Sequence, residues 1–135
     1  MKFSPLGINL YTFLKLPSAW WCGVRLVTIT PMVCEVKVRL KWFNQNPFKS
    51  MFWAVQGMAA ELATGILIMQ GAKSSQSKIS MLVINNKANF TKKAKGKLLF
   101  SCRPGDRIEK TFAALIETKE PQTLWLQAKG TDEQG

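Results

Sequence analysis

Residues 50 to 69, SMFWAVQGMAAELATGILIM, form a long apolar run without proline, and this run constrains the fold most strongly. Alanine, methionine and leucine are strong helix formers, and bulky residues recur here at intervals of three and four. The bulky positions are Met51, Val55, Met58, Leu62, Ile66 and Met69. The Ser50 hydroxyl can accept a hydrogen bond from the first unpaired N–H groups of a helix. The run therefore predicts a central helix that begins near Ser50 and has one apolar face.

Glu61 is the only charged residue between Lys49 and Lys73. A carboxylate in apolar surroundings costs free energy unless it is paired or protonated, which makes Glu61 a candidate functional residue. The alternative is a core helix in which a neighbouring Asn or Lys satisfies this carboxylate. The run is also about long enough to span a bilayer, but Gln56 and Thr64 near its middle count against that interpretation. We expect no membrane span.

The composition is that of one globular domain. The chain has 135 residues, of which 47% are hydrophobic and 20% are charged. It carries 19 Lys and Arg against 8 Asp and Glu, a net charge of +11. Such an excess favours anionic partners, namely phosphorylated cofactors, nucleic acid or acidic lipid headgroups, without choosing among them.

The cysteines and the absence of histidine narrow the chemistry. Cys22, Cys34 and Cys102 are an odd number without a CxxC motif and are typical of reduced, buried thiols in a cytoplasmic protein. The N-terminus has no signal-peptide pattern. The chain contains no histidine, and this absence excludes Ser-His-Asp catalysis, Cys-His catalysis and nearly all zinc sites. No metal site is therefore expected. An enzyme here must use a carboxylate, amide, hydroxyl or backbone group.

The remaining elements follow from periodicity and turn residues. Residues 1–23 are predicted to form an N-terminal helical segment, with a helix over residues 8–16, and residues 24–135 are predicted to form the main domain. Strands are predicted over residues 24–30, 33–43, 78–91, 97–103 and 123–129, and a short helix follows Asp106. The strand over 78–91 is apolar on both faces, so it is central or buried against a second subunit. TDEQG is typical of a hairpin turn but has no returning strand after it, so we expect the sheet to be incomplete at its C-terminal edge.

Three passages carry a resemblance to a known superfamily: NQNPFKSMFWAVQGMAAELATG, ANFTKKAKGKLLF and LWLQAKGTDEQG. Together with the order of the elements, they resemble the hotdog-fold thioesterase-like superfamily, and most of all an uncharacterised domain-of-unknown-function branch of it. The resemblance covers residues 24 to 135. It implies an α+β hotdog fold, in which an antiparallel sheet wraps around one long central helix.

The resemblance also implies a function at a subunit interface. Members typically act as dimers on acyl-thioesters of coenzyme A or acyl carrier protein, so a homodimer or a dimer of dimers is expected. Coenzyme A would be part of the substrate, and no separate cofactor is expected. Many members carry Asn, then His-Gly-Gly six residues later, then an acid nine residues past the His. Asn46 and Glu61 match the first and last positions, but Phe52, Trp53 and Ala54 replace His-Gly-Gly.

Two functions stay open after that departure: hydrolysis of acyl-thioesters, and binding of acyl chains or acyl-CoA without catalysis. For hydrolysis, Glu61 could activate a water, and N–H groups near Met51 and Phe52 could polarise the carbonyl. Asn46 or Gln56 could orient the water or the substrate. The alternative for both amides is that they form hydrogen bonds only within their own loop or helix.

A basic turn supplies candidates for binding the phosphates of coenzyme A. The candidate side chains are Lys87, Lys92, Lys93 and Lys95. The alternative is an ordinary solvated turn. Nucleic-acid binding is a third possible function, but the aromatic residues mostly alternate into apolar faces and are not interleaved with Lys and Arg. We expect no nucleic-acid partner.

Overall fold

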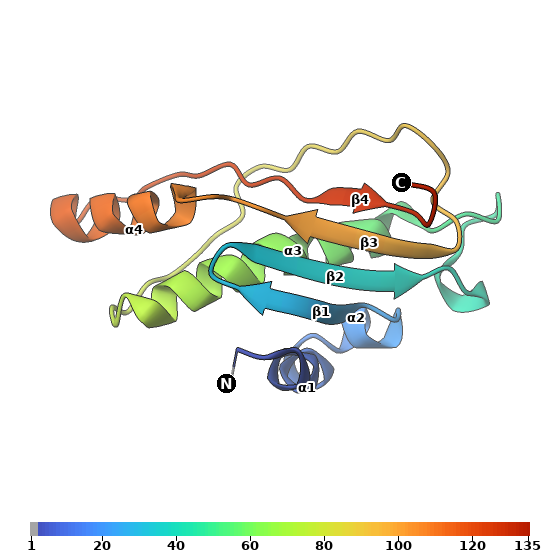
Figure 1. The fold of residues 1–135 in the computed structure, drawn as a ribbon, viewed down its shortest axis with the longest axis horizontal. Coiled ribbons are helices and arrows are strands. Elements are labelled where there is room, and N and C mark those ends of the chain that lie inside the picture. The colour runs from blue at the N-terminus through green and yellow to red at the C-terminus, as the bar shows by residue number, and fades with distance from the viewer. Residues whose placement is uncertain (1–2) are drawn as a thin grey trace.

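A computed structural model describes residues 3–135 as a four-stranded antiparallel sheet packed against one long helix (Figure 1). The sheet order is β1-β2-β3-β4. The strands are β1 (Arg25–Thr30), β2 (Val33–Arg39), β3 (Lys97–Cys102) and β4 (Lys129–Thr131). The helices are α1 (Pro5–Lys15), α2 (Pro17–Trp21), α3 (Trp53–Ser74) and α4 (Arg107–Thr118), with a 3-10 turn η1 (Trp42–Asn44). The predicted α+β class with one long helix is confirmed.

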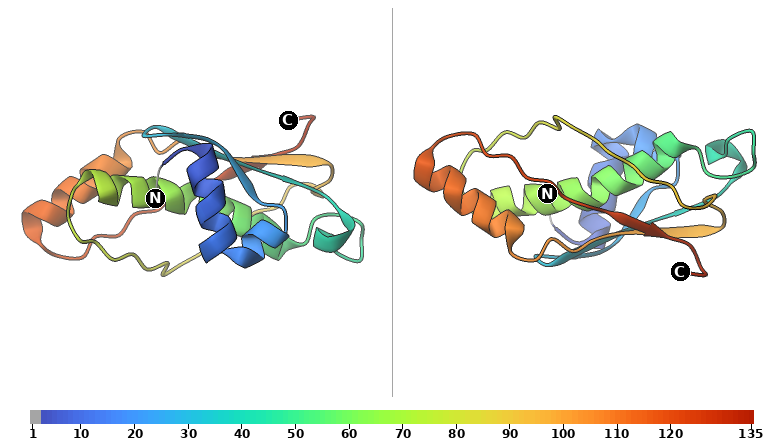
Figure 2. Two further views of the ribbon diagram at one scale, coloured as in Figure 1. Left: turned by 90° about the horizontal axis from the view of Figure 1, so that it is seen from below. Right: turned by 90° about the horizontal axis from the view of Figure 1, so that it is seen from above.

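The core lies between α3 and the inner face of the sheet (Figure 2). The buried positions of α3 are Val55, Ala59, Leu62, Ala63, Ile66 and Leu67. They face alternate residues of the two middle strands, namely Cys34, Val36 and Val38 on β2 and Leu98, Phe100 and Cys102 on β3. β2 lies within the strand predicted over residues 33–43, and its buried residues alternate with less buried ones. Among the described residues, no helix combines the length and hydropathy that crossing a bilayer requires.

The N-terminal helices close the free edge of β1. The Asn9 side chain accepts a hydrogen bond from the Leu26 N–H at 2.8 Å and donates one to the Leu26 carbonyl at 3.1 Å. An amide placed in this way imitates a neighbouring strand and blocks pairing with another chain at that edge. The helix predicted over residues 8–16 is present as α1.

The boundaries of the central helix differ from the prediction. α3 begins at Trp53, not at Ser50, and runs to Ser74 beyond the predicted end at residue 69. Its N-cap is Phe52, which makes no side-chain capping bond. The Ser50 hydroxyl instead bonds to the Asn46 side chain, so it is used by the preceding loop.

Two predicted strands are wrong for the single chain. Residues 78–91 pair with no strand, and nearly all are exposed as the segment runs back along α3 (Figures 1 and 2). Residues 123–128 are also outside the sheet, where β4 covers only Lys129–Thr131 and pairs with β3 alone. An apolar, extended segment becomes a strand only where a free sheet edge pairs with its N–H and C=O groups. The sequence pattern cannot specify that neighbour.

Candidate functional site

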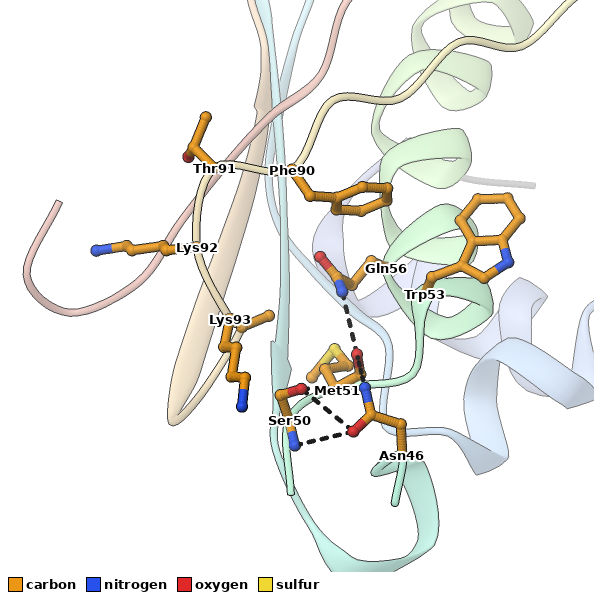
Figure 3. Close-up of a pocket in the computed structure, with 10 residues that line it drawn as sticks. Asn46, Ser50, Met51, Trp53, Gln56, Phe90, Thr91, Lys92 and Lys93 are labelled. Atoms are coloured by element: carbon orange, nitrogen blue, oxygen red, sulfur yellow. Dashed lines mark hydrogen bonds between the residues drawn. The ribbon is translucent and has the colours of Figure 1, made fainter. Parts of the chain in front are cut away.

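A pocket of about 430 Å³ opens where α3 begins (Figure 3). Its walls come from the loop before α3, from the first turns of α3, and from residues 90–94. The lining residues are Asn46, Ser50, Met51, Trp53, Gln56, Phe90, Thr91, Lys92, Lys93 and Ala94. Four predicted site residues therefore meet in one place, namely Asn46, Gln56, Lys92 and Lys93.

Main-chain hydrogen bonds fix the two sides of this pocket to each other. The Met51 N–H donates to the Ala94 carbonyl at 2.8 Å, and the Phe52 N–H donates to the Asn44 carbonyl at 2.9 Å. These are the N–H groups that we expected to polarise a substrate carbonyl. The expectation does not hold for these two residues themselves, because both donors are already used inside the fold.

The next two N–H groups along the chain remain available. The N–H groups of Val55 and Gln56 both donate to the Phe52 carbonyl, at 3.0 and 3.3 Å. The first N–H groups of a helix have no acceptor within the helix. Within residues 3–135, the N–H groups of Trp53 and Ala54 have no hydrogen-bond acceptor. These donors lie at the positive end of the α3 dipole, which favours a developing negative charge, and Trp53 also lines the pocket.

Asn46 holds its own loop. Its side-chain oxygen accepts from the N–H groups of Phe48 at 2.9 Å and Ser50 at 3.3 Å, and its side-chain nitrogen donates to the Ser50 hydroxyl at 3.0 Å. Lys49 in the same loop has a φ of 61°, in the left-handed region. These contacts support the alternative for Asn46, in which its amide forms hydrogen bonds within its own loop.

Gln56 is the amide that faces the pocket. Its side-chain nitrogen donates to the Met51 carbonyl at 3.1 Å, which fixes the orientation of the side chain. Its side-chain oxygen lies on the side of Phe90 (Figure 3). In the part of the chain that the structure describes, no group donates a hydrogen bond to this oxygen. It can therefore accept a hydrogen bond from a water or from a substrate N–H.

Glu61 does not line the pocket and is exposed. It lies five residues after Gln56, which in an α-helix is about 7.5 Å along the axis and about 140° around it. Glu61 instead follows Trp53 and Gly57 along one stripe of α3, where a Cβ on Gly57 would come within 3.2 Å of the Trp53 ring. The single chain therefore does not provide the apolar surroundings that were expected, and a catalytic role for Glu61 stays a prediction.

The four predicted lysines separate into two pairs. Lys87 and Lys95 are exposed and do not line the pocket. Lys92 forms an ion pair of 2.9 Å with Asp132, and the hydrogen bond from Lys92 lowers the pKa of the Asp132 carboxyl. Lys93 places its ammonium 5.9 Å from the centre of the Phe48 ring. No carboxylate in residues 3–135 forms an ion pair with Lys93, so this cation is available for an anionic group at the rim.

Sequence reasoning missed Asn44, which positions this loop. Its side chain is buried, accepts from the Lys41 N–H at 2.7 Å, and donates to the carbonyls of Cys22 at 3.0 Å and Arg39 at 2.9 Å. Nothing in the NQN pattern distinguishes Asn44 from Asn46. Phe90 and Thr91 were also missed as lining residues, because they were assigned to a strand. Among residues 3–135, no three Cys, Asp or Glu side chains are placed to hold a metal ion.

Comparisons with solved structures find the same fold in several bacterial proteins. A Pseudomonas aeruginosa protein of unknown function, described as a "probable thioesterase", has a TM-score of 0.81 at 22% identity, covering 98% of this chain and 87% of that one. A protein of unknown function from Chlorobaculum tepidum has a TM-score of 0.73 at 12% identity, covering 94% and 92%. A Shewanella oneidensis protein suggested to be a thioesterase has a TM-score of 0.66 at 9% identity, covering 79% and 77%.

Comparisons of the sequence identify the family of the chain. No curated protein matches the chain. The family model for DUF4442, a domain of unknown function, matches residues 9–135. The chain shares its fold with proteins described as thioesterases, and, as the resemblance to a domain-of-unknown-function branch predicted, it belongs to the DUF4442 family.

Proposed function

We propose that this protein binds acyl-thioesters of coenzyme A or acyl carrier protein in the pocket at the start of α3, and that it hydrolyses them. One observation carries the proposal. Trp53, whose N–H group is unpaired, and Gln56, whose side-chain oxygen is free, line the same pocket, and the unpaired N–H group of Ala54 follows Trp53 in the first turn of α3. The fold shared with proteins described as thioesterases supports the same reaction class.

The chemistry follows from what each group can donate or accept. The thioester carbonyl oxygen accepts hydrogen bonds from the Trp53 and Ala54 N–H groups, which stabilise the negative charge that forms when water attacks. The Gln56 oxygen orients that water. Glu61 of the same chain lies away from this pocket, so the general base that takes the proton of the water is Glu61 of the partner subunit in a homodimer. The carbon–sulfur bond then breaks, the thiolate leaves and is protonated, and the fatty acid is released.

The pocket needs a second subunit in this proposal. Residues 81–84 are large, apolar and exposed, and Leu82 is 81% exposed. An unpaired extended segment with apolar side chains is a ready template for pairing with another chain. We propose a homodimer whose contact includes residues 78–91 and encloses the exposed stripe of α3 that carries Glu61. Lys93, at the rim, would contact the phosphates of coenzyme A.

A second candidate function is binding without hydrolysis. It is favoured by the distance of Glu61 from the pocket of its own chain, and by the bulky Phe52 and Trp53 at positions where related enzymes have His and Gly. A non-catalytic module would still bind the acyl thioester at the start of α3.

The two functions are separated by measuring turnover and binding on one panel. Thiol release is followed for acyl-CoA substrates of increasing chain length. Binding is followed by tryptophan fluorescence, and because the chain has five tryptophans, Trp53→Phe is the control that assigns the change to this pocket. The proposal predicts thiol release that saturates with at least one acyl chain length. Fluorescence changes without thiol release would favour the binding module. If neither thiol release nor a fluorescence change is observed, both functions are contradicted.

A further inference from the structure

α1 presents an apolar face to solvent. Its buried side chains are Ile8 and Thr12, which pack toward the rest of the fold. The opposite side of the helix carries large apolar residues, all of them exposed: Leu6, Leu10, Phe13 and Leu14. Leu6 is 83% exposed. A helix with apolar residues turned outward at intervals of three and four has a surface that something else must cover.

This face continues into a basic, aromatic pocket. The rings of Phe13 and Trp20 meet edge to face at 5.2 Å, and the Arg25 guanidinium stacks 3.4 Å from the centre of the Trp20 ring. Beyond Trp20 lies a pocket of about 770 Å³ between α2, the sheet and η1. Its lining residues are Trp20, Trp21, Cys22, Gly23, Arg25, Arg39, Lys41 and Phe43. We call the outward side of α1 together with this pocket the α1–α2 surface.

The α1–α2 surface is separate from the pocket at the start of α3. Figure 1 places α1 and α2 below β1, at the edge of the sheet opposite β4. The two pockets share no lining residue. The inference drawn from this surface therefore does not rest on the proposed function.

Charge identifies the chemistry of the partner. Residues 1–60 contain one acidic residue, Glu35, which lies on β2 and is 3.7 Å from Arg103. Their basic residues are Lys2, Lys15, Arg25, Lys37, Arg39, Lys41 and Lys49. No acidic side chain lines the pocket, and none belongs to α1 or α2. A two-fold contact between copies would bring this basic surface against itself, whereas an anionic surface would neutralise it.

We propose that the α1–α2 surface docks onto an anionic lipid bilayer. The leucines and Phe13 of α1 enter the boundary between headgroups and acyl chains, as in helices that lie flat in a membrane interface. Trp21, which is 73% exposed, lies at the depth of the headgroups, where its amphipathic ring is favoured. Arg39 and Lys41 contact lipid phosphates at the mouth of the pocket.

Vesicle co-sedimentation of the full chain tests this. One set of vesicles is phosphatidylcholine alone, and the other is phosphatidylcholine mixed with phosphatidylglycerol. We expect binding to the anionic vesicles only. Replacing Arg39 and Lys41 by Gln should weaken it by about tenfold to thirtyfold, because each cation near an anionic surface contributes. Replacing Leu10 and Leu14 by Gln should weaken it by about tenfold or more.

Matched controls use exposed residues on other elements. Ile116→Gln on α4, and the pair Lys119→Gln and Lys129→Gln, should leave vesicle binding unchanged. Circular dichroism confirms that each variant folds. Equal binding to both vesicle types, or to neither, overturns the proposal. Full displacement by inorganic phosphate also overturns it, in favour of a free phosphate ligand. If the Leu10 and Leu14 variant binds vesicles normally but loses a dimer in sedimentation, a second copy covers this surface instead.

Discussion

The Gln56 side chain donates a hydrogen bond of 3.1 Å to the Met51 carbonyl, and this bond leaves its oxygen free beside the pocket. If this oxygen orients the attacking water, Gln56→Ala should lower kcat/KM by about tenfold or more. The KM for the acyl-thioester should change less than kcat. Gln70→Ala, on α3 but outside the pocket lining, is the matched control. Equal kcat/KM values for Gln56→Ala and the parent would remove Gln56 from the mechanism.

Asn46 is expected to act on stability and not on chemistry. Asn46→Ala removes the acceptor of the Phe48 and Ser50 N–H groups, which should lower the free energy of unfolding by about 1–3 kcal/mol. Asn46→Asp retains an acceptor there and should recover most of the loss. Urea unfolding measures both changes. A large loss of turnover with unchanged stability would instead indicate a direct role in catalysis.

The thiol of Cys34 should make the protein sensitive to alkaline pH. Burial, followed by the adjacent Cys102 and Glu35, raises the pKa of Cys34 from 9.0 to about 12. The folded state therefore holds this proton more tightly than the unfolded state does. The resulting stabilisation is complete below pH 9 and is lost as the pH rises toward 12. Cys34→Ala should flatten the fall in the free energy of unfolding across this range, measured by urea titration, whereas Cys22→Ala should not. Identical pH slopes for the parent and Cys34→Ala would contradict the assignment.

The proposed dimer should depend on contacts made by residues 78–91. Leu82→Lys introduces a charge into the proposed contact and should shift the protein toward monomer in sedimentation velocity at micromolar concentration. Ile116→Lys, also on an exposed apolar position, should leave the distribution unchanged. A parent that is already monomeric would remove the subunit contact from the account.

The sequence predicted those helices and strands in which the spacing of apolar residues follows from one side of the element being buried. β2 alternates because one side faces α3, and α3 repeats at three and four because it faces the sheet. The prediction failed for residues 78–91 and 123–128, where strand formation depends on a neighbouring edge that no local pattern encodes. It also expected the N–H groups near Met51 and Phe52 to be open to a substrate, although the fold already uses those of Met51 and Phe52. The N–H groups of Met51 and Phe52 donate hydrogen bonds to the carbonyls of Ala94 and Asn44, and the local sequence does not specify these acceptors.

The most direct test of the central claim is the rate of thiol release by the parent and by Glu61→Gln on the best acyl-CoA substrate. If Glu61 is the general base, the substitution should lower kcat by about 10²–10⁴-fold. The fold of the single chain should be unaffected, because the side chain is exposed there. Equal rates for the two proteins would contradict the catalytic assignment, and a parent that binds acyl-CoA but releases no thiol would contradict hydrolysis itself.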